Sequence, residues 1–130
     1  MKEIWFKTLD KMETLTMEYG EVMSLVREMV GGNCRLIFSI FQTAPGRKWT
    51  PESWTIIIPN IKSEKPVYEG KVKFISKWEE YDGNTIKNPT WKDILIEANN
   101  AANGDHVFLE SLREQSEIDG VKVIDMTFGS

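Results

Sequence analysis

The chain has 130 residues, of which 41% are hydrophobic and 28% charged, and its net charge is −4. This is an ordinary globular composition, so disorder is not expected, and the acidic balance argues against nucleic acid or an anionic membrane as the main partner. The single cysteine, Cys34, excludes an intrachain disulfide and a cysteine-based zinc site.

No run approaches the ~20 apolar residues of a membrane span, and the first residues lack the apolar core of a signal peptide. We therefore expect a cytoplasmic protein without membrane contact; the alternative is a mature form whose leader peptide is absent from this sequence. Residues 1–130 contain no repeat, low-complexity segment or linker, which predicts one domain.

Apolar residues recur at three- and four-residue steps through the first thirty positions, which predicts helix over residues 3–30. Two glycines, Gly31 and Gly32, provide a stop signal for the part at 21–30. Gly20 lowers helix propensity, so whether 3–30 form one helix or two stays open.

Three strands are predicted next, at 34–42, 54–58 and 71–78, separated by a loop at 60–69. In the third strand polar and apolar residues alternate, and three lysines lie on one face (Lys71, Lys73 and Lys77). Such a stripe indicates a solvated face or a protected sheet edge. The following segment, 79–88, is predicted to be a loop.

The clearest local pattern lies between Thr90 and Gly104. Thr90 is a good N-cap residue, Asp93 occupies the capping-box position, and Gly104 is a stop signal. The predicted buried stripe comprises Trp91, Ile94, Leu95, Ala98 and Ala102. Strands at 106–112 and 121–128 follow, and we expect them to pair as a hairpin.

The resulting order, α-β-β-β-α-β-β, predicts an α+β fold. We expect a mostly antiparallel, curved sheet of about five strands covered by two amphipathic helices. A cone-shaped α+β barrel is the alternative.

His106 is the only histidine, and it lies beside Asp105 at the start of a predicted strand. Glu110 shares its face but lies roughly 13 Å away along a strand, too far for a hydrogen bond. Asp105, or Asp125 on the neighbouring strand, could instead orient the imidazole as a general base. The candidate catalytic residues are therefore His106, Asp105 and Asp125, for a hydrolase, isomerase or dehydratase. The alternative is a structural helix–strand junction.

The five tryptophans exceed what a chain of this size needs. Trp49, Trp54 and Trp78 lie beside predicted loops and could line an apolar pocket, although core packing is the alternative. The leading hypothesis is a non-enzymatic binding or interaction protein, which takes a small apolar ligand or a protein partner, or forms a homodimer. No cofactor and no metal site are predicted, since no ligand-spaced motif occurs.

Overall fold

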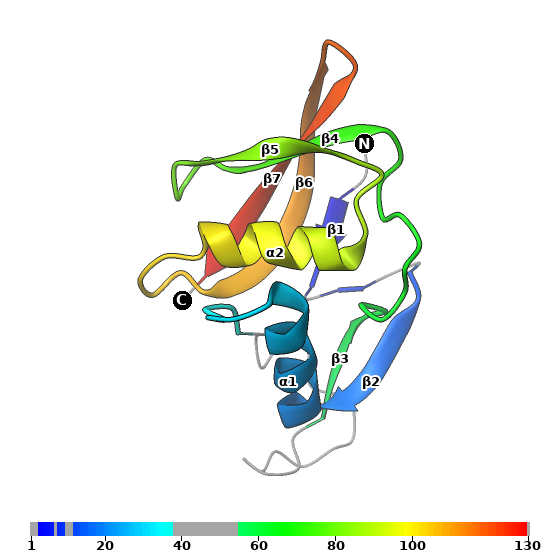
Figure 1. Ribbon diagram of the computed structural model, residues 1–130, viewed down its shortest axis with the longest axis vertical. Coiled ribbons are helices and arrows are strands. Elements are labelled where there is room, and N and C mark those ends of the chain that lie inside the picture. Colours follow the sequence, from blue (N-terminus) through cyan, green and yellow to red (C-terminus); the bar gives the residue numbers. More distant parts are fainter. Residues whose placement is uncertain (1–2, 7, 10–11, 38–54, 130) are drawn as a thin grey trace.

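The computed structural model describes residues 3–6, 8–9, 12–37 and 55–129 (Figure 1). These residues contain two helices and seven strands, which confirms the predicted α+β class. The elements in chain order are β1 (Glu3–Trp5), β2 (Thr14–Glu18), α1 (Tyr19–Val30), β3 (Thr55–Pro59), β4 (Lys71–Ser76), β5 (Tyr81–Lys87), α2 (Trp91–Ala101), β6 (Phe108–Ile118) and β7 (Val121–Gly129). Neither of the helices in this part of the chain is long and apolar enough to cross a bilayer.

Five strands form the main sheet, in the order β1-β6-β7-β4-β5. The central β4–β7 pair is parallel and the other three pairs are antiparallel, so the sheet is mixed. The sheet is open, with β1 and β5 at its edges, and the barrel alternative is therefore wrong. A second, two-stranded sheet pairs β2 with β3.

Helix α2 lies across one face of the main sheet and forms the centre of the core (Figure 1). All five residues of its predicted stripe are buried. The Asp93 carboxylate accepts hydrogen bonds from the Thr90 N–H (2.9 Å) and hydroxyl (3.1 Å), as the capping-box pattern predicts. The helix ends at Ala101, earlier than the predicted stop at Gly104, and Gly104 instead forms a turn with φ +56°.

Helix α2 also holds the segment that follows α1. The buried Asn99 accepts backbone N–H bonds from Arg35 (2.6 Å) and Leu36 (3.3 Å), and its amide donates to the Asn33 carbonyl (3.0 Å). A buried amide with three such bonds fixes a segment that has no strand ladder of its own. The two helices are thereby connected through polar contacts as well as apolar packing.

The predicted helix over 3–19 is wrong, because this region contains β1 and β2; only the part at 21–30 is confirmed, within α1. The sequence of β2, TLTME, alternates polar and apolar residues, and its burial alternates with it. That period of two, with two β-branched threonines, favours a strand once β3 is available as a partner.

The predicted strand at 34–42 lies largely outside the described residues. Cys34–Leu36 belong to no strand, and Ile37 forms an isolated parallel bridge with Phe108. The predicted strands at 54–58 and 71–78 correspond to β3 and β4.

The predicted loop at 79–88 is wrong, because it contains β5, which pairs with β4. As a result β4 is an internal strand, and its lysine stripe does not protect an edge. Gly83, part of the apparent turn signal, sits where a Cβ would lie 2.5 Å from Glu97 and 2.7 Å from the Phe74 carbonyl. The glycine therefore permits a close approach within a strand. From α1 onward the described elements follow the order α-β-β-β-α-β-β, with β5 as one of the three middle strands; β1 and β2, which precede α1, were not predicted.

The predicted hairpin of the last two strands is confirmed as β6–β7. Strand β6 is longer than expected and continues to Ile118, through a polar stretch predicted to be a turn. Two register shifts interrupt its ladder with β7. Pairing with β7 thus extends a strand beyond its apolar pattern.

Candidate functional site

The turn between β4 and β5 presents Trp78, whose side chain is 80% exposed. Lys77, which precedes it, is fixed by two bonds. Its N–H donates to Asp125 Oδ1 of β7 (3.0 Å), and its Nζ donates to Gln115 Oε1 of β6 (2.7 Å). The residue before Trp78 is therefore bonded to both β6 and β7.

Glu79, which follows Trp78, is held by a contact with a different part of the chain. Its Oε1 lies 2.6 Å from His106 Nδ1, in the segment between α2 and β6. The Glu79 side chain is only 5% exposed, whereas that of His106 is 40% exposed. Both residues that flank Trp78 are thus anchored to elements distant in the sequence.

The three predicted catalytic residues are distributed over this corner. His106 contacts a carboxylate, as the hypothesis required, but the carboxylate belongs to Glu79 and not to Asp105 or Asp125. Asp105 is exposed, and Asp125 accepts the Lys77 N–H bond. Glu79 was not selected from the sequence, because it lies 27 positions from His106.

The His106–Glu79 contact has a defined chemical capacity. A carboxylate at Nδ1 orients an imidazole and leaves Nε2 for proton exchange with another molecule. The partial exposure of His106 is compatible with such exchange. The same contact also links the β4–β5 turn to the segment before β6.

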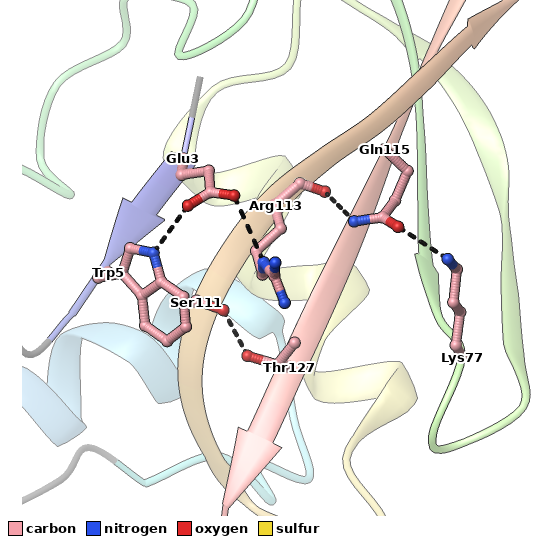
Figure 2. A network of polar contacts seen from close by, with 7 residues as sticks. All are labelled: Glu3, Trp5, Lys77, Ser111, Arg113, Gln115 and Thr127. Atoms are coloured by element: carbon pink, nitrogen blue, oxygen red, sulfur yellow. Dashed lines mark hydrogen bonds and ion pairs between the residues drawn. The ribbon is translucent and has the colours of Figure 1, made fainter. Parts of the chain in front are cut away.

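A chain of polar contacts continues from this turn along the face of the sheet opposite α2, as Figure 2 shows. The Gln115 amide donates to the Arg113 carbonyl (3.5 Å), and Arg113 Nε donates to Glu3 Oε1 (3.5 Å). Trp5 Nε1 donates to the other oxygen of Glu3 (3.1 Å), and the Arg113 guanidinium lies 5.7 Å from the Trp5 ring centroid. This series of polar contacts runs from β1 across β6 to the turn after β4.

The Trp5 hydrogen bond, followed by the nearby positive charge of Arg113, lowers the pKa of the Glu3 carboxyl. Beside this group, the buried Ser111 hydroxyl bonds to the hydroxyl of Thr127 across β6 and β7. These contacts join β1 to β6 and β6 to β7 on this face of the sheet.

On the opposite face, the Tyr81 hydroxyl donates to Glu97 Oε2 (2.9 Å), which joins β5 to α2. Burial, and then the hydrogen bond to the Glu97 carboxylate, raise the pKa of Tyr81 to about 12. Glu97 is 8% exposed, and its other oxygen, Oε1, has no hydrogen-bond partner among the residues that the structure describes. Tyr81 thus partly offsets the cost of burying a carboxylate.

The predicted aromatic pocket can be compared with the structure at one of its three tryptophans. Trp49 and Trp54 lie outside the described residues, and Trp78 projects from its turn. A groove of about 670 Å³ lies beside α1, and a smaller one of about 170 Å³ has Trp91 in its wall; Trp78 lines neither. Within the described ranges, no group of three or more histidine, cysteine or acidic residues could hold a metal ion.

The fold and the site define an open, mixed α+β domain with an anchored aromatic turn beside a histidine–carboxylate pair. No protein-family model matches the chain, and neither curated proteins nor solved structures give a significant match.

Proposed function

We propose that this protein is a non-enzymatic interaction domain and that Trp78 is the residue that inserts into its protein partner. The observation that carries the proposal is the 80% exposure of Trp78 on a turn fixed at both flanking residues. Tryptophan is among the residues most enriched at the energetic centres of interfaces, since it buries a large area on contact.

The exposure of Trp78 supports an interface role because the turn that carries it is fixed. A single exposed apolar side chain is common on protein surfaces and needs no function. A flexible loop would also lose conformational entropy on binding, whereas a turn already held by Lys77 and Glu79 loses less. Preorganisation of this kind favours Trp78 over Ile118, which is also highly exposed in the described part of the chain.

Photo-crosslinking tests this proposal. A benzophenone amino acid is placed at position 78 and, as the matched control, at Ile118, which is 59% exposed at the end of β6. We expect a discrete adduct from position 78 only. Excess unmodified protein should suppress it, and excess Trp78→Ala protein should not. An adduct of twice the chain mass identifies the homodimer form of the proposal.

Equal labelling from positions 78 and 118 would contradict the proposal, as would equal suppression by the wild-type and Trp78→Ala proteins. Circular dichroism of Trp78→Ala should match the wild type, because the side chain has few contacts to lose. That measurement separates lost binding from lost folding.

A second candidate function is supported by the 2.6 Å contact between His106 and Glu79. A hydrolase, isomerase or dehydratase would use His106 as its general base and Glu79 as its positioning residue. The test is turnover of a panel of activated esters and of enolisable and dehydratable hydroxy acids by wild type, His106→Gln and Glu79→Gln. Loss of turnover in His106→Gln, with an altered pH profile in Glu79→Gln, is expected. If the wild type turns over none of these compounds, the enzymatic candidate loses its support.

A further inference from the structure

A second surface, built from different elements, lies along the exposed side of α1. It is an open groove of about 670 Å³, within the usual volume range of ligand sites. The half-buried side chains of Met17 and Leu25 provide its apolar part. The remaining lining residues are polar, charged or glycine, so an apolar strip runs between charged groups.

The charges of this groove are predominantly acidic. Among the lining residues that the structure describes are three acids, Glu18, Glu21 and Glu28, and one cation, Lys62. Within the described part of the chain none of the three carboxylates forms an ion pair, and Glu18 does not cap α1 with its side chain. All three are therefore available to a cationic group from outside.

The spacing of these groups follows the helix. Glu21, Leu25 and Glu28 lie at successive turns of α1, and seven residues of helix span roughly 10 Å. Gly20 and Ser24 also line the groove, and a Cβ added at Gly20 meets nothing within 4 Å. Small residues leave room for an elongated occupant that crosses the helix at close range.

We propose that this groove binds a basic, amphipathic segment of a partner protein. Lysine or arginine side chains two helical turns apart match Glu21 and Glu28, and apolar side chains between them match the Met17–Leu25 strip. A second copy of the chain, docked groove to groove, would bring like charges together. This surface and its occupant are separate from the contact at Trp78, so either can fail without the other.

The probe is a fluorescein-labelled 14-residue peptide with lysines seven residues apart and leucines between them on the same helical face. Its binding is measured by fluorescence anisotropy at 50 and 200 mM salt. Saturable binding that weakens at the higher salt is expected. Two control peptides replace lysine by glutamate, or leucine by serine, and each should bind at least tenfold more weakly. Equal binding of either control peptide would overturn the proposal.

Variants locate the site. Glu21→Lys/Glu28→Lys should weaken binding at least tenfold, whereas Glu69→Lys/Glu117→Lys, with the same change in net charge, should weaken it less than threefold. All four positions are exposed, so both proteins should fold. Gly20→Gln narrows the groove without a change in charge and should also weaken binding. Equal weakening by the two charge-reversal pairs, or full displacement of the peptide by micromolar spermine, would overturn the assignment.

Discussion

The two helices of this protein occupy contrasting positions. Helix α2 begins with a capping box and buries seven of its eleven residues, whereas α1 has no side-chain cap and buries three of twelve. Most positions of α2 are therefore constrained by packing. Substitutions on the outward face of α1 should leave the core packing intact. The contrast indicates that α2 maintains the fold, while surfaces beside α1 are available for binding.

The strongest test of this contrast truncates one apolar residue in each helix. Ile94 is fully buried in α2, and its replacement by alanine should reduce the free energy of unfolding by about 2–5 kcal/mol. Leu25 of α1 is half-buried, and Leu25→Ala should cost about 1 kcal/mol, since less area returns to water. Urea denaturation followed by far-UV circular dichroism measures both. Equal losses would show that α1 and α2 contribute alike to the core.

A smaller loss of unfolding free energy is expected from a substitution at the contact between α2 and β5. Tyr81→Phe removes the donor to the buried Glu97 carboxylate and should cost about 1–3 kcal/mol at neutral pH. Because folding raises the Tyr81 pKa from 10 to about 12, its contribution is complete below pH 10 and is lost as the pH rises towards 12.

Unfolding free energies measured between pH 8 and 12 test whether the contribution of Tyr81 to stability falls as the pH rises. The decline above pH 10 should be shallower in Tyr81→Phe than in the wild type. Buried Tyr68, whose pKa is also raised by burial, should keep part of the decline in the variant. An unchanged slope would show that Tyr81 does not couple folding to pH.

The smallest expected difference in stability is between substitutions in the first turns of the two helices. Asp93 of α2 accepts two bonds from Thr90, so Asp93→Ala should cost about 1 kcal/mol. Glu21, the acidic residue in the first turn of α1, has no such bond, and Glu21→Ala should cost less than about 0.5 kcal/mol. Thermal denaturation at low salt compares them. A larger loss for Glu21→Ala would reverse the proposed contrast.

The same contrast explains which elements could be predicted from the sequence. The cap, stripe and N-terminal boundary of α2 depend on neighbours three or four positions apart, and the pattern specifies them within one segment. The strands β1 and β5 carry little apolar pattern and form through ladders with β6 and β4, which short-range patterns do not contain. The alternation of TLTME in β2 was a usable signal, hidden by the longer helical period around it.

The candidate site shows the same limit. His106 could be selected because it is the only histidine, and its need for a carboxylate followed from chemistry. The identity of that carboxylate depends on where the β4–β5 turn lies relative to the segment after α2, and only the folded sheet determines it. For Trp78, the sequence suggested a role near a loop but could not reveal the bonds that fix its neighbours.

The central parallel pair has a consequence for how the chain folds. Strand β4 forms its hairpin with β5 early in the sequence, yet its other neighbour, β7, begins fifty positions later, at Val121 opposite Lys71. Until β7 arrives, one edge of β4 has no partner, and the buried side chains Val72 and Phe74 lack part of their cover. Pairing of β4 with β7 closes a loop of about fifty residues and should limit the folding rate. Intermediates in which the β4 edge is still unpaired should be the species most prone to aggregate during refolding.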